Sequence, residues 1–307
     1  MQDKEDQRAI YPSLKRVLIT GGEPVSVWNL SAELGEGPVW TGRALWFVDI
    51  KKPAVYRLDP VSGERRSWSA PELIGFLLPD RSGGFVAGLQ SGPHRFDPVS
   101  GAFTPLVAVE PNLPNNRLND GVVDPAGRLW FGTMDNGEKA KSGAFYCLEN
   151  GQVRPAGIGD ICITNGPAVS PDGRILYTVD TLKGTISTSN IRADGTLGEV
   201  RPFVQIDPGD GYPDGPTVDS EGCVWIGLYA GWHARRYSPA GELLSAVRFP
   251  VANITKLAFG GDDLRTVFAT TARQFLKPEE LTKQPQAGDL FSFRTEVPGV
   301  SSPTAAF

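Results

Sequence analysis

Six short stretches of the chain share one pattern, in which alternating apolar and aromatic residues follow a polar, glycine-rich turn. The stretches are residues 45–50, 85–90, 129–134, 176–181, 224–229 and 267–272. Their starts are roughly 40 to 48 residues apart, which is the repeat length of propeller blades. Period-two alternation between turns is typical of strands that bury one or both faces. The pattern therefore predicts a repeated β unit.

A second series of strand-like stretches follows the first within each repeat. Its members are residues 54–63, 92–101, 143–151, 185–195, 233–241 and 289–296. Each ends in a polar turn, and the turn Asp-Pro-Val-Ser-Gly occurs twice, at 59–63 and 97–101. Six copies of two hairpin-like halves predict an all-β fold, a six-bladed β-propeller with four-stranded blades around a central channel.

The ends of the chain fit a closed ring. We expect a single propeller domain over residues 1–307, with residues 1–15 as a flexible N-terminal extension. Residues 17–28 are expected to pair with the last blade, because such pairing removes exposed sheet edges. The stretch 275–283 is the best candidate for a short helical turn, since no segment shows sustained helical periodicity.

Composition and charge narrow the classes of partner. The 307 residues carry a formal net charge of −5 without a basic cluster, so no nucleic-acid partner is expected. The apolar runs are too short for a bilayer span, so no membrane partner is expected either. The charged N-terminus lacks the apolar core of a secretory signal, and the three cysteines form no C-x-x-C pair. These features favour a cytoplasmic protein with buried thiols.

A polar residue followed by Gly-Pro recurs at the start of the innermost strand in three repeats. Glu36, Asn165 and Asp214 hold this position, and Asn119 stands in a close variant, Asn-Asp-Gly-Val. Repeats two and six depart from the pattern. Because equivalent positions of different blades face one another across a propeller channel, these side chains are expected to converge on its axis.

Two carboxylates and one amide oxygen form an all-oxygen set that suits a hard divalent cation. The positive charge of such a cation also offsets the repulsion between two neighbouring carboxylates, which would otherwise raise a pKa. The alternative reading is that x-Gly-Pro is only a favoured turn at the start of each inner strand. One cation is expected at the axis, and Ca, Mg, Mn, Fe(II) and Zn all remain compatible with it.

These motifs resemble the gluconolactonase/senescence-marker-protein (regucalcin-like) family of six-bladed propellers. The resemblance covers nearly the whole chain. It rests on LGEGPVW at 34–40, RLNDGVVDPAGRLWFGTM at 117–134, ITNGPAVSPDGRILY at 163–177 and YPDGPTVDSEGCVW at 212–225. The segments at 160–167 and 270–273 are most similar to bacterial xylono- or arabinonolactonases.

The resemblance implies roles for particular residues. Glu36, Asn165 and Asp214 would hold the divalent metal, and Asp214 would also serve as the catalytic acid/base. Arg117 and Asn119 would contact the substrate, a sugar lactone. The family often places a substrate-binding Glu shortly after the Gly-Thr-Met motif, whereas this chain has Glu138 at a displaced position. The implied activity is hydrolysis of the lactone to the aldonic acid.

Other functions remain alternatives. One is a metal-dependent esterase or organophosphate hydrolase, and another is a calcium-binding propeller without turnover, because a fold does not decide a function. A serine hydrolase is disfavoured, since the chain lacks a G-x-S-x-G elbow. Its two histidines, His94 and His233, are expected to be structural. The sequence leaves the oligomeric state and the preferred sugar open.

Overall fold

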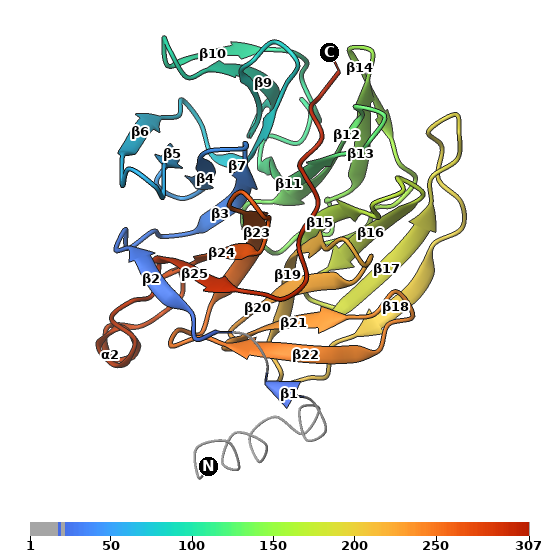
Figure 1. Ribbon diagram of the computed structural model, residues 1–307. Coiled ribbons are helices and arrows are strands. Elements are labelled where there is room, and N and C mark those ends of the chain that lie inside the picture. Colours follow the sequence, from blue (N-terminus) through green and yellow to red (C-terminus); the bar gives the residue numbers. More distant parts are fainter. Residues whose placement is uncertain (1–17, 20–21, 307) are drawn as a thin grey trace.

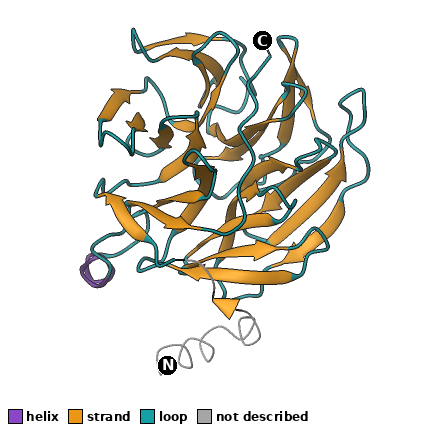
Figure 2. Cartoon of the chain, in the orientation of Figure 1, coloured by secondary structure: helices purple, strands orange, loops and turns teal. Residues whose placement is uncertain are grey.

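The computed structural model describes residues 18–19 and 22–306, and these form an all-β molecule of curled sheets around a common centre (Figure 1). Strands make up nearly all of its regular structure (Figure 2). Four sheets have four strands each, and a fifth has nine. This arrangement is that of a β-propeller, as the repeats predicted.

The four-stranded sheets follow one another along the chain. The first comprises β3 (Gly35–Trp40), β4 (Leu45–Asp49), β5 (Ala54–Leu58) and β6 (Arg65–Ser69). The second comprises β7 (Ile74–Pro79), β8 (Phe85–Leu89), β9 (Gly92–Asp97) and β10 (Ala102–Pro105). The third comprises β11 (Asn116–Val123), β12 (Leu129–Asp135), β13 (Phe145–Glu149) and β14 (Gln152–Pro155). The fourth comprises β15 (Thr164–Val169), β16 (Ile175–Asp180), β17 (Thr185–Asn190) and β18 (Arg201–Gln205).

The nine-stranded sheet consists of two halves. One half contains β19 (Tyr212–Val218), β20 (Val224–Tyr229), β21 (His233–Tyr237), β22 (Leu243–Arg248) and β1 (Leu18–Ile19). The other contains β23 (Ile254–Gly260), β24 (Thr266–Thr271), β25 (Leu290–Arg294) and β2 (Val25–Trp28). A single paired position, Gly215 with Lys256, joins the two halves. Each half therefore contains a four-stranded unit like the separate sheets, and β1 is added at the edge of the first half.

The innermost strands contact one another in a closed ring. Successive contacts link β3, β7, β11, β15, β19 and β23, and β23 contacts β3 again. The hydroxyl of Thr255 in β23 donates to the carbonyl oxygen of Gly35 in β3 at 2.6 Å, so it links the last innermost strand to the first. The ribbon diagram shows these strands arranged around a common centre (Figure 1).

The N-terminal strands pair in two different places. β2 pairs antiparallel with β25, as predicted for residues 17–28. β1 instead pairs parallel with β22, so the prediction that this whole segment joins the last repeat is wrong for Leu18–Ile19. The exposed edge of β22 offers free backbone groups to β1, which explains the pairing. The predicted flexible extension, residues 1–15, lies outside the described residues.

The predicted helical turn is α2 (Pro278–Lys283), which follows β24. Pro278 begins it, and Glu279 and Glu280 lie in its first turn, where carboxylates oppose the positive end of the helix dipole. Within the described part of the chain, no helix has the length and apolar character needed to cross a lipid bilayer.

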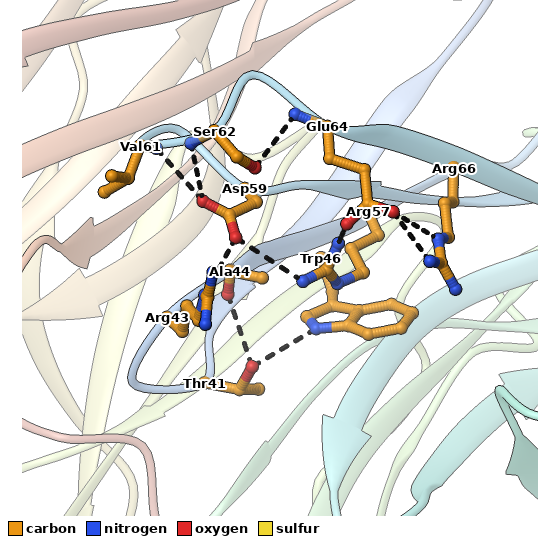
Figure 3. A network of polar contacts seen from close by, with 10 residues as sticks. All are labelled: Thr41, Arg43, Ala44, Trp46, Arg57, Asp59, Val61, Ser62, Glu64 and Arg66. Carbon is orange, nitrogen blue, oxygen red and sulfur yellow. Dashed lines mark hydrogen bonds and ion pairs between the residues drawn. The ribbon is translucent and has the colours of Figure 1, made fainter.

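Aspartates stabilise the predicted turns. In the first Asp-Pro-Val-Ser-Gly turn, Asp59 accepts hydrogen bonds from the backbone amides of Val61 and Ser62 and from the Arg43 guanidinium (Figure 3). These donors lower the pKa of Asp59 to about 2. Asp97 binds the equivalent amides in the second copy. Each carboxylate thus fixes a tight turn by local hydrogen bonds.

The C-terminal segment crosses one end of the channel. Gly299 pairs with Asp219, and Ala305 pairs with Asp80 on the other side of the ring. Ser301, Ser302 and Pro303 line a cavity there together with the C-terminal ends of the innermost strands. The segment, red in Figure 1, therefore covers the channel end opposite the polar motifs.

Candidate functional site

A break in strand pairing positions each polar motif. All six innermost strands shift register against their neighbours, and the shifts lie at residues 36–39, 74–76, 118–121, 165–168, 213–216 and 254–257. A β-bulge bends the strand and re-aims a side chain. Proline is tolerated there because the inner edge of the strand faces the channel and needs no ladder donor. The Gly-Pro pairs therefore direct the preceding polar side chains toward the axis.

Arg117, Asn119 and Asn165 form one chain of hydrogen bonds. Arg117 Nη1 donates to Asn119 Oδ1 at 2.6 Å, and Asn119 Nδ2 donates to Asn165 Oδ1 at 3.1 Å. Asn165 Nδ2 donates to the hydroxyl of Thr181 at 2.9 Å, which in turn donates to the carbonyl oxygen of Pro213. The chain fixes both amide orientations and links three adjacent innermost strands at the level of the motifs.

Three carboxylates gather beside these amides. Glu36 and Asp214 are buried, and burial followed by the negative charge of Asp120 raises the pKa of Glu36 to about 8. Burial, then the charge of Glu36, raises the pKa of Asp214 well above its usual range. Asp120 Oδ1 accepts from Lys256 Nζ and from the amide of Gly121. Glu36 and Asp214 therefore need further positive charge nearby before both can ionise.

These residues fit a divalent cation. Asp120 Oδ2 is buried and has no hydrogen-bond partner, so it is an acceptor that a bound cation or the water around it would satisfy. Glu36, Asp214 and the amide oxygen of Asn165 supply hard oxygen donors. No group of three or more His, Cys, Asp or Glu side chains placed to hold a metal occurs among the described residues. The set consequently depends on the Asn165 amide as its third ligand.

One cavity of about 270 Å³ opens over this cluster. Its lining includes all six residues singled out from the sequence: Glu36, Arg117, Asn119, Glu138, Asn165 and Asp214. Glu138 reaches the cavity from the turn after β12, where its backbone adopts φ 57°. The preceding Asp135 accepts hydrogen bonds from the amides of Gly137, Lys139 and Ala140 and holds that turn. The displaced position of Glu138 thus still faces the same space.

Arg117 is buried, and no carboxylate among the described residues is hydrogen-bonded to it. Its Nε donates to Asn136 Oδ1 at 3.2 Å, and Lys51 Nζ donates to the same oxygen at 2.8 Å. Its Nη1 also donates to the carbonyl oxygen of Leu118. Within the described residues no hydrogen bond uses Nη2, so this donor remains for a ligand. The neighbouring charges of Glu138, Glu36 and Asp214 favour the charged guanidinium, although burial lowers its pKa to about 10.

The sequence analysis did not identify several residues of the site. Thr181 directly follows β16 and holds Asn165, but a single threonine after a strand carries no sequence signal. Asp120 of the carboxylate cluster stands inside the Asn-Asp-Gly-Val variant, so the motif itself could have indicated it. Leu182, Tyr212 and Phe275 come from loops or strand ends of the fourth sheet and of both halves of the nine-stranded sheet, and only folding brings them to one cavity.

The histidines and cysteines lie away from this cavity. His94 and His233 are both buried at the start of a third strand, and each has Nδ1 within hydrogen-bond distance of the carbonyl oxygen two residues earlier. Burial lowers the pKa of His233 to about 4, so it is neutral at physiological pH. Cys147, Cys162 and Cys223 are free thiols and buried, as predicted.

Known proteins resemble this chain along most of its length. The family model described as SMP-30/Gluconolactonase/LRE-like region matches residues 34–273. The 6-deoxy-6-sulfogluconolactonase of Pseudomonas putida is 34% identical over 277 residues, which span 89% of this chain and 95% of that protein. The L-arabinolactonase of Azospirillum brasilense is 35% identical over 280 residues, which span 88% and 91%.

Solved structures agree with the sequence comparisons. The calcium-binding protein regucalcin of Agrobacterium tumefaciens has a TM-score of 0.90 and 27% identity, over 95% of this chain and 99% of that one. The region matched by the family model contains the whole hydrogen-bonded chain from Arg117 to Pro213, and it also contains Glu36 and Asp214.

Proposed function

The chain belongs to the SMP-30/gluconolactonase/LRE-like family, and on that premise we propose that it hydrolyses a sugar lactone to the aldonic acid with one divalent cation. Two relatives named as lactonases support an enzyme that opens cyclic esters. The calcium-binding regucalcin supports a divalent metal.

One observation carries the proposal. The buried carboxylates of Glu36 and Asp214 and the amide of Asn165 line one cavity. The buried guanidinium of Arg117 lines the same cavity, and its Nη2 makes no hydrogen bond within the described residues. An all-oxygen set suits a hard cation, and a donor-rich guanidinium suits sugar hydroxyls. A purely structural turn at Glu36, Asn165 and Asp214 would not require the Arg117–Asn119–Asn165 hydrogen bonds.

The residues have separate tasks in the proposed reaction. A bound cation supplies Lewis acidity that polarises the lactone carbonyl. Asp214 takes the proton of the attacking water and returns it to the ring oxygen as the acyl C–O bond breaks, which opens the ring to the aldonic acid. Glu36, Asn165 and Asp214 would hold the cation, and the ion pair of Asp120 with Lys256 lies beside them.

The wall formed by β11 and the turn after β12 orients the substrate. Arg117 donates from Nη2 to a sugar hydroxyl, and Asn119 is held by Arg117 beside the same position. Glu138, in the turn after β12, accepts a hydrogen bond from another sugar hydroxyl. Correct placement of the carbonyl beside Asp214 lowers the entropic cost of the reaction.

We also propose that the described sheets form six blades of a single domain. The two halves of the nine-stranded sheet would count as separate blades, since only Gly215 and Lys256 pair between them. Six equivalent innermost strands, each with a register shift, support this division.

Hydrolysis of a lactone panel tests the function. The measurement is acid release with a pH indicator, for chelator-stripped protein and for protein given each divalent metal in turn. We expect release from pentono- or hexonolactones far above the spontaneous rate, and only with metal. Equal rates with and without metal would exclude the metal's role. No release with any metal would favour the esterase or the non-catalytic calcium-binding alternative, which aryl esters and calcium calorimetry then separate.

A further inference from the structure

Three large apolar side chains stand exposed at the mouth of the cavity. Leu182, Tyr212 and Phe275 line the cavity, yet they are 50%, 47% and 70% exposed. A single exposed apolar residue is ordinary on a protein surface. Three at one cavity mouth, supplied by the fourth sheet and by both halves of the nine-stranded sheet, indicate a surface that contacts a ligand.

Phe275 is held outward by a strained backbone. Its φ of 66° lies in the left-handed region, which bulky residues rarely adopt. The carbonyl oxygen of Gln274 before it accepts from the Tyr229 hydroxyl at 2.7 Å and from Asn253 Nδ2, while Leu276 after it packs against the core. The fold therefore presents an aromatic ring to solvent from a fixed turn.

The proposed substrate-binding residues and the exposed apolar residues of the lining come from different members of the ring. Arg117, Asn119 and Glu138 all belong to the third sheet and its turn after β12. The apolar mouth comes from the next three members of the ring: Leu182 after β16, Tyr212 in β19 and Phe275 after β24. Because β11, β15, β19 and β23 contact in that order, the apolar mouth extends away from the polar wall. A ligand between them needs one polar and one apolar side.

The charges of the lining disfavour an anionic ligand. Glu36, Glu138 and Asp214 face the cavity, and Arg117 is the one cation among its described lining residues. A divalent cation would bring the formal charge of this lining to zero and leave no excess positive charge for an anion. The cavity's 270 Å³ is at the small end for ligand pockets, which suits a single-ring lactone.

On the premise of the proposed lactonase function, we propose that Leu182, Tyr212 and Phe275 form an apolar subsite for the carbon of the sugar lactone farthest from its carbonyl. This subsite receives an uncharged CH₂ or CH₃ group, while the hydroxyls face Arg117, Asn119 and Glu138. The enzyme therefore prefers neutral deoxy-lactones over their parent lactones, and it disfavours lactones with a carboxylate or sulfonate at that carbon.

Matched substrates test this preference. The measurement is kcat/KM for a hexonolactone, its 6-deoxy analogue and its 6-sulfonate, all of one configuration, with the activating metal. We expect the deoxy-lactone to exceed the parent by about tenfold, the lower range for one apolar group in a hydrophobic pocket, and the sulfonate to be slowest. A sulfonate as good as the parent, or a parent equal to the deoxy-lactone, would overturn the proposal.

Two variants test whether the apolar residues at the cavity mouth cause the preference for deoxy-lactones. Phe275→Gly removes the ring and relieves the positive φ, and Leu182→Ser removes a second apolar group. Each is expected to reduce the deoxy-to-parent ratio of kcat/KM at least threefold. Leu113→Ser is the matched control, because Leu113 is 42% exposed and does not line the cavity. An unchanged ratio in both variants would place the preference elsewhere.

Binding separates this proposal from the lactonase function. Calorimetry with the non-hydrolysable lactams of the parent and deoxy sugars requires no turnover. Tighter binding of the deoxy-lactam that is lost in Phe275→Gly supports the subsite even if no lactone is hydrolysed. Equal binding of the two lactams by a protein that hydrolyses lactones would reject the subsite and leave the proposed function intact.

Discussion

Each residue at the axis is defined by its hydrogen bonds and its charged neighbours rather than by its type alone. Asn165 is an acceptor toward Asn119 and a donor toward Thr181, so its amide has one orientation. Asp214 is buried among carboxylates that raise its pKa, which is the environment of a group that exchanges protons during a reaction. In the proposed mechanism, Asp214 binds the metal through an oxygen and also transfers a proton. A substitution can separate these two roles.

Asp214→Asn tests that separation. Asparagine keeps an oxygen donor but cannot take a proton, so we expect metal binding by calorimetry to persist while kcat falls at least a hundredfold. The control is Asp207→Asn, an exposed carboxylate on the preceding loop, for which kcat should not change. Normal turnover by metal-loaded Asp214→Asn would assign the proton transfer to another group.

The innermost strands determine where the site residues lie. Each of the six has a register shift near the channel, and three of the shifts coincide with the Gly-Pro motifs. The close approach of neighbouring strands excludes side chains at certain positions. At Gly75 in β7, an added Cβ would lie 2.1 Å from the carbonyl oxygen of Asn119. That glycine occupies the repeat without a polar motif, and its role is to let β11 approach.

Gly75→Ala should therefore both destabilise the fold and disturb the site. The methyl group meets backbone, which cannot rotate away, so we expect a loss of about 3 kcal/mol in the free energy of unfolding measured in urea. Lactone turnover should also fall because Asn119 moves. Gly198→Ala is the control, since its Cβ would meet nothing closer than 3.5 Å. A loss no larger than that of the control would contradict the close packing of β7 and β11.

The whole molecule closes its ring with segments from both chain ends. β2 completes a sheet with β25, and the C-terminal segment crosses the channel end remote from the cavity. Ala305 is fully buried there, its amide donates to Pro79, and its carbonyl oxygen accepts from the amide of Arg81. This contact joins the last residues of the described chain to the second sheet, so it couples distant parts of the sequence.

Ala305→Arg is expected to lower stability without altering the chemistry. A charged side chain forced into this covered position should cost about 3 kcal/mol in thermal or urea unfolding. At 25 °C, kcat should stay near the wild-type value, since the two cavities share no lining residue. Thr304→Arg, at an exposed neighbour, is the control. A large fall in kcat in folded Ala305→Arg would show that the segment influences the site.

The sequence alone determined the strands, the turns and the polar motifs, because these depend on local chemistry. The stretches 45–50 and 224–229, for example, correspond to β4 and β20 within one residue. Period-two alternation and Asp-Gly turns involve residues only a few positions apart, so they can be recognised from the sequence alone. The recurrence of the motif also indicated which polar residues share the axis, and their role there remains a proposal.

Only the tertiary structure decided what surrounds those residues. The parallel pairing of β1 with β22, the Asp120–Lys256 ion pair and the apolar mouth of Leu182, Tyr212 and Phe275 each join segments distant in sequence. No local propensity specifies such a partner, since it follows from the curvature and closure of the whole ring. The sequence therefore indicates the chemistry at the channel axis, and the folded ring determines the shape and charge of the cavity that a substrate meets.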